Sequence, residues 1–81
     1  MNDTVIRLIA LYSELAMARA DELETRANVW SSLPADTPVT ARDREVDYQT
    51  HDLKREVWKL EAEIRGLELQ LDYQKWTVEH Q

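Results

Sequence analysis

The sequence predicts an all-α fold: a long antiparallel helical hairpin that forms a single domain over 1–81. Its 81 residues contain one glycine and two prolines among many strong helix formers. Both prolines lie in the stretch SSLPADTPVT, residues 31–40, which is the only visible interruption. After this interruption, apolar residues recur in heptads. We therefore expect a helix over about 3–31, a loop over about 32–39 and a second helix over about 40–78, packed in a coiled-coil-like manner.

The first predicted helix is amphipathic, with apolar residues recurring at the helical period. Its apolar side comprises Val5, Leu8, Ile9, Tyr12, Leu15, Ala16, Leu23, Ala27 and Trp30. The opposite side comprises Arg7, Glu14, Asp21 and Thr25. Arg19 and Arg26 flank the apolar side, where their alkyl stems can pack while their charged ends need acidic partners. Pro34 disfavours helical geometry at Leu33, so we expect this helix to end just before that residue.

The second predicted helix begins at one of two capping signals, Thr37 followed by Pro38 or Thr40 followed by Asp43. Its heptad seam has ten residues: Thr50, Val57, Ile64, Leu71 and Val78 at a, with Val46, Leu53, Leu60, Leu67 and Gln74 at d. Eight of the ten are apolar; Thr50 and Gln74 are polar. Because this helix is the longer of the two, we expect 71–81 to project past the start of the first helix.

The charges beside this seam favour an antiparallel partner. In a parallel homodimer Glu56 would meet Glu61 of the other chain, and Glu63 would meet Glu68. Such like-charge contacts are unfavourable. The arginines that flank the first helix can instead reach Glu56 or Asp52 if the chain folds back on itself. The seam is therefore expected to pack on the first helix of the same chain.

The second predicted helix has another apolar side, opposite the seam. We call it the outer face and define it by Tyr48, Trp58, Ala62, Gly66, Leu69, Tyr73 and Trp76. One interpretation is a solvated surface that happens to carry aromatic residues. A protein-contact surface is the stronger interpretation, because tryptophan and tyrosine dominate interface energetics. Gly66 costs a helix interior about 1 kcal/mol relative to alanine, which is tolerable where another backbone comes close.

Composition argues against several classes of function. The net charge is −6, and no basic cluster is expected on one face, so nucleic acid is not an expected partner. No stretch approaches a membrane span, so we expect a cytoplasmic protein, or one within a virion if the protein is viral. His51 lies between Asp47 and Arg55, without a third metal ligand within sequence reach. We expect no catalytic residues, metal, cofactor or small-molecule substrate.

These observations favour a non-enzymatic module that acts by protein–protein contact. The first hypothesis is a self-associating structural or assembly component of a larger complex, including viral particles by compositional analogy. The hairpins would then form a helical bundle. The alternative is a small inhibitor or regulator that binds a larger enzyme or regulatory protein through the outer face. The sequence leaves both partner and oligomeric state open.

Overall fold

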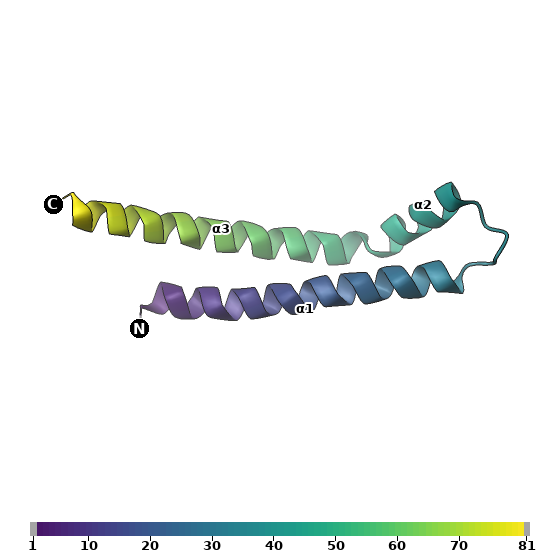
Figure 1. Cartoon of the computed structure of the whole chain (residues 1–81), viewed down its shortest axis with the longest axis horizontal. Helices are drawn as coiled ribbons and strands as arrows, with labels where there is room; N and C mark the ends of the chain where they lie inside the picture. Colours follow the sequence, from purple (N-terminus) through teal and green to yellow (C-terminus); the bar gives the residue numbers. More distant parts are fainter. Residues whose placement is uncertain (1, 81) are drawn as a thin grey trace.

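The expected all-α fold is confirmed by the computed structural model, which describes residues 2–80. Three helices follow in order: α1 spans Asp3–Ser32, α2 spans Val39–Gln49 and α3 spans His51–Glu79. The molecule is elongated and measures 66 × 21 × 14 Å. α1 lies alongside α2 and α3 and runs in the opposite direction, so the chain begins and ends toward the same end of the molecule (Figure 1).

Local sequence accounts for both ends of α1. The side chain of Asn2 accepts a hydrogen bond from the backbone N–H of Thr4 at 2.7 Å, which satisfies one of the free donors of the first turn. At the other end, the Ser32 hydroxyl donates to the Val29 carbonyl at 2.8 Å. Leu33 then adopts an extended conformation, as expected for a residue before proline.

Arg42 organises the connection between α1 and α2. Its guanidinium donates to the carbonyls of Trp30 at 2.7 Å, Thr37 at 3.2 Å and Pro34. It also lies 5.4 Å from the centre of the Trp30 ring. The carbonyl of Trp30 belongs to the last turn of α1, where carbonyls lack partners within the helix. One side chain therefore stabilises the end of α1 and the loop together.

The start of α2 differs from both capping signals. The helix begins at Val39, directly after Pro38, without a side-chain cap. Thr40 therefore lies inside the first turn, and the prediction that it caps the helix with Asp43 was wrong. A backbone hydrogen bond from Arg42 N–H to the Pro38 carbonyl, 3.0 Å long, closes the first turn instead.

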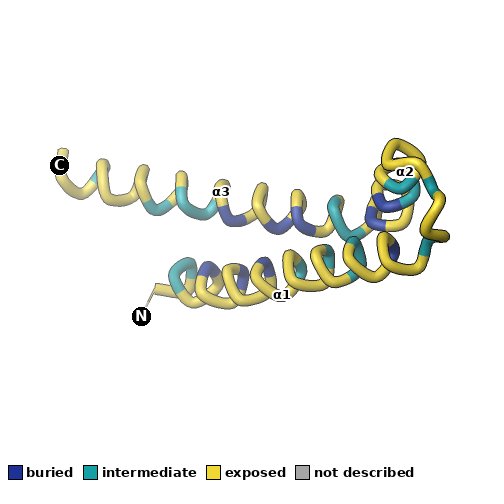
Figure 2. The backbone as a smooth tube through the Cα atoms, turned by 45° about the vertical axis from the view of Figure 1, so that its right-hand side comes forward, coloured by how far each residue is buried: buried dark blue, intermediate teal, exposed yellow. Residues whose placement is uncertain are grey.

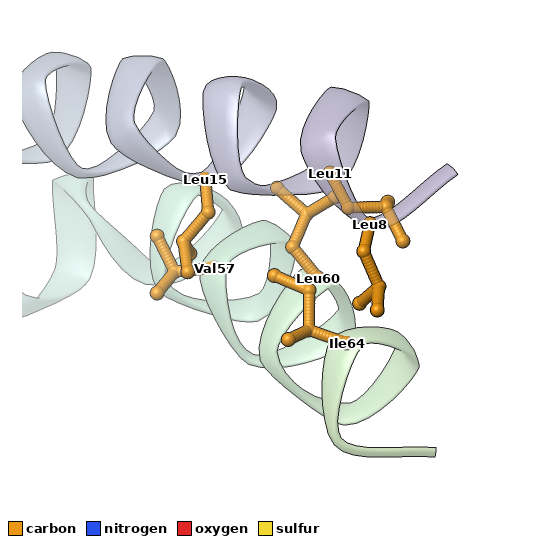
Figure 3. Packing of buried hydrophobic residues seen from close by; sticks show 6 residues of the cluster. All are labelled: Leu8, Leu11, Leu15, Val57, Leu60 and Ile64. Carbon is orange, nitrogen blue, oxygen red and sulfur yellow. The ribbon is translucent and has the colours of Figure 1, made fainter. Parts of the chain in front are cut away.

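The main cluster of buried apolar residues lies between α1 and α3, on the sides where the two helices face each other, and Val29 of α1 and Val46 of α2 are buried outside it (Figure 2). Six buried residues form it, with their side chains directed toward the opposite helix (Figure 3): Leu8, Leu11, Leu15, Val57, Leu60 and Ile64. Ala18, Leu67 and Leu71 pack against this cluster and are partly buried. Each fully buried leucine, valine or isoleucine side chain contributes about 1.5–3 kcal/mol relative to an exposed one.

The core side of α1 was predicted only in part. Leu8 and Leu15 are buried as expected, but Leu11, which the sequence analysis left out, is fully buried. Six predicted members are exposed: Ile9, Tyr12, Ala16, Leu23, Ala27 and Trp30. Thr25, assigned to the opposite side, is half-buried. The physical reason is that a single neighbouring helix covers only a narrow row of α1 residues. The residues of this row are spaced alternately by three and four positions in the sequence.

The second predicted helix is interrupted at Thr50, so the expectation of one continuous helix over about 40–78 was wrong. Thr50 is fully buried, and its backbone has φ −101° and ψ 4°. Both its N–H, at 3.0 Å, and its hydroxyl, at 2.7 Å, donate to the carbonyl of Val46. Threonine hydroxyls that bond back to the preceding turn bend helices. α2 and α3 accordingly run in different directions (Figure 1).

All three arginines of α1 form ion pairs with acids of α2 or α3. The pairs are Arg7 with Glu63 at 2.9 Å, Arg19 with Glu61 at 2.9 Å and Arg26 with Asp47 at 3.7 Å. The expected partners Glu56 and Asp52 were therefore wrong, although the arginines do face acids. These groups are partly exposed, so each pair contributes at most about 1 kcal/mol. The main consequence of these ion pairs is that the three arginines of α1 point toward α2 and α3.

No helix among the described residues is long and apolar enough to cross a membrane.

Candidate protein-contact surface

All seven residues of the predicted outer face are exposed. Six of them lie on α3, at positions that are opposite the buried Val57, Leu60 and Ile64 around the helix. Trp58 keeps 62% and Tyr73 keeps 69% of its surface exposed. Tyr48 belongs to α2, so the interruption at Thr50 separates it from the others. The exposure expected for this face is therefore present on α3, with Trp58 near the start of the helix and Tyr73 and Trp76 near its end.

Packing within residues 2–80 does not require glycine at position 66. A Cβ atom placed on it would meet nothing within 4 Å. Its backbone φ is not positive, so no unusual conformation requires glycine either. Glycine nevertheless costs a helix interior about 1 kcal/mol relative to alanine. The glycine is therefore unexplained by the contacts of a single copy.

The C-terminal part of α3 extends past the start of α1 (Figure 1). Leu71 still packs on the core, so the projection begins after it and not at 71 as predicted. Val78, a seam residue by its heptad position, is exposed because α1 does not reach it. The rings of Trp76 and His80 stack there, with centres 4.4 Å apart. Gln81, which was also expected to project, lies outside the described residues.

The outer face carries bases as well as aromatic rings. Arg55, Lys59 and Arg65 are exposed on this side of α3 and form no ion pair within residues 2–80. The three bases are spread over 55–65 of α3, and the exposed acids Asp52 and Asp72 lie beyond the edges of the outer face. Neighbouring acids Glu61 and Glu63 point toward the arginines of α1 instead. The angular position of each charged residue around the helix separates these bases from the acids that pair with α1, so the sequence contains the signal that identifies them.

The side of α1 that faces away from α3 has the opposite character. We call it the α1 face and define it by Ile6, Ile9, Ser13, Ala16, Met17, Ala20, Asp21, Glu24 and Ala27, all of which are exposed. Asp21 and Glu24 form no ion pair in the described part of the chain. No arginine of α1 points to this side, because all three contact acids of α2 or α3. The α1 face is therefore acidic and rich in small residues.

Two titratable groups at the junctions between helices have shifted pKa values. The Tyr12 hydroxyl donates to Glu68 at 2.9 Å, and this hydrogen bond raises the pKa of Tyr12 above 10.0. The hydrogen bond from Lys54 to Asp47, at 3.0 Å, and the lysine charge lower the pKa of Asp47 below 3.8. Arg26 adds to the second effect, and burial opposes it. Both groups support contacts between helices.

His51 begins α3, directly after the interruption at Thr50. A shallow depression is lined by Tyr48, Gln49, His51 and Asp52 at the bend between α2 and α3. Residues 2–80 contain no group of three or more histidine, cysteine, aspartate or glutamate residues arranged to hold a metal ion. The surfaces with the clearest chemical character are therefore the outer face of α3 and the α1 face.

No protein-family model, curated protein or solved structure matches this chain.

Proposed function

We propose that this chain is an antiparallel helical hairpin with coiled-coil-like packing that acts by protein contact. We propose further that it is a non-enzymatic, self-associating structural or assembly component, which acts in the cytoplasm or within a particle if the assembly is viral. The observation that carries the proposal is the outer face, where Trp58, Leu69, Tyr73 and Trp76 are all exposed on one helix. Exposed apolar surfaces of this kind mark sites of protein interaction.

The small core gives a physical reason for association. Six buried residues hold α1 to α3, and a single core in a chain of 81 residues rarely supplies more than about 3–5 kcal/mol. Each tryptophan or tyrosine that becomes buried removes about 150–250 Å² from water. Burying the outer face against another protein therefore adds stability that the hairpin lacks.

The test separates folding from association. Trp58→Ser combined with Leu69→Ser removes two exposed anchors, and we expect helicity to persist while the mass in solution falls to that of one chain. Leu60→Asp places an unpaired charge in the core and should unfold the hairpin. Gln70→Ser combined with Gln74→Ser is the matched control, because both glutamines are exposed on α3 but lie outside the outer face.

Circular dichroism reports helicity, and light scattering reports mass. An equal loss of helix in the Trp58/Leu69 and Leu60 variants would show that the outer face is core and would refute the proposal. Unchanged association of the Trp58/Leu69 variant would refute it as well.

The unpaired bases support a second candidate function. Arg55, Lys59 and Arg65 together with the aromatic residues would fit an acidic site on a larger protein, as an inhibitor or regulator would require. Stoichiometry distinguishes the two candidates. A regulator of this kind is a folded monomer that titrates its target, whereas an assembly component associates with itself.

A further inference from the structure

We propose that self-association is head-to-tail: the outer face of α3 in one copy docks antiparallel on the α1 face of a second copy. This inference rests on the proposed function and specifies which surfaces meet. It differs from a two-fold dimer, in which the same patch of both copies would meet itself.

The two faces carry opposite charges although they belong to the same chain. The outer face has Arg55, Lys59 and Arg65 without ion partners in residues 2–80. The α1 face has Asp21 and Glu24, also unpaired, and no base. Two outer faces brought together would repel each other, and so would two α1 faces. An outer face against an α1 face is the attractive combination.

Helical geometry selects the antiparallel orientation. Successive residues turn by about 100° around a helix, so Lys59 lies toward one edge of the outer face, whereas Arg55 has the same direction as Tyr73. By the same rule Asp21 lies toward one edge of the α1 face, whereas Glu24 has the same direction as Ile6. Antiparallel docking brings these two edges together, with Arg55 opposite Glu24 and Lys59 beside Asp21. Parallel docking would place them on opposite sides of the contact.

The same antiparallel register aligns the uncharged residues. It places Ala62 opposite Met17, Gly66 opposite Ser13 and Tyr73 opposite Ile6. All six of these residues are exposed in the single chain. Glycine opposite serine is the smallest pair in the contact, so the two helix backbones approach most closely there. This accounts for a glycine that no contact within one copy requires.

A head-to-tail contact has a consequence for the size of the assembly. Each added copy leaves one outer face and one α1 face free at the ends, so association continues into a filament unless the rotation closes a ring. In such an array α1 and α3 alternate in direction. Because Lys59 and Asp21 lie at the edge of the contact, where salt screens charges, we expect added salt to weaken the association.

Paired charge reversals test the docking. The basic-face variant carries Arg55→Glu and Lys59→Glu, and the α1-face variant carries Asp21→Lys and Glu24→Lys. We expect each variant alone to remain helical and to lose association. An equimolar mixture of the two should recover it, because each reversed face then meets a face of opposite charge. A chain carrying all four substitutions should also associate. A variant with Asp36→Lys and Asp43→Lys is the matched control, because these exposed acids lie outside both faces.

Each outcome of the light-scattering series has a distinct meaning. Recovery in the mixture, with the control unchanged, supports the head-to-tail contact. Association that survives the α1-face reversal overturns the head-to-tail docking but leaves self-association intact. Loss in both variants without recovery in the mixture also overturns the docking. A natural sequence that is monomeric at every concentration overturns the proposed function and this inference together.

Discussion

Two leucines of α1 provide a sharp test of which side of this helix is core. Leu11 has 0% of its surface exposed and lies in the six-residue cluster between α1 and α3. Leu23 has 69% exposed, although its position in the sequence pattern suggested a core residue. Each is replaced by alanine, which is the strongest helix former, so helix propensity does not penalise either variant.

The two substitutions are expected to lower the free energy of unfolding by very different amounts. Removing a buried leucine side chain costs about 2–5 kcal/mol, from lost burial and the cavity left behind. Because Leu11 is fully buried but only two helices surround it, we expect about 3 kcal/mol for Leu11→Ala. Leu23→Ala removes few contacts within the chain, so we expect less than about 0.5 kcal/mol.

Urea unfolding followed by circular dichroism measures both values. The samples need equal protein concentration, since association with other copies adds to apparent stability. Because the core is small, Leu11→Ala is expected to remove most of the free energy of unfolding. A stabilising osmolyte is therefore added to all samples to obtain a folded baseline. Equal costs for the two variants, or a larger cost for Leu23→Ala, would refute the assignment of the core side.

Further predictions concern the loop, the glycine and one ion pair. Arg42→Ala removes the donors to two loop carbonyls and to the Trp30 carbonyl of α1 and should cost about 1.5–3 kcal/mol in urea unfolding, while Arg42→Lys should recover only part of this. Gly66→Ala should stabilise the helix of a dilute monomer by about 0.5–1 kcal/mol yet weaken association measured by light scattering, and unchanged association would contradict the close approach. The pKa of Asp47 is lowered in the folded state, so its contribution is present above the ordinary value of 3.8 and is lost as pH falls through the lowered pKa. The stability difference between the natural chain and Asp47→Asn should therefore shrink on acidification, and an unchanged difference would contradict the role of Lys54.

Local signals in the sequence predicted much of the fold. Pro34 ends α1 at the expected place, and heptad spacing correctly identified Val57, Leu60 and Ile64 as core. The same reasoning was less successful on α1, where two apolar rows lie side by side. Helical periodicity identifies both rows, but only the position of α3 decides that the row containing Leu11 is buried.

Features that depend on contacts between distant residues were not predictable in this way. Arg42 connects the last turn of α1 to the loop through three carbonyls, and no local pattern in the sequence predicts that arrangement. Thr50 occupies an ordinary heptad position, and its double hydrogen bond to Val46 appears only in three dimensions. The aromatic residues of the outer face followed from periodicity. The unpaired bases on it were missed because charges were counted along the chain and not around the helix.

The most direct test of the central claim is the absolute mass of the chain in solution. Light scattering over about a hundredfold range of concentration reports the mass, and circular dichroism on the same samples reports the helix. The account predicts a helical protein whose mass exceeds one chain, grows past a dimer with concentration and falls with added salt. A fully helical monomer at every concentration would contradict it, because the outer face would then remain exposed without contacting a second copy.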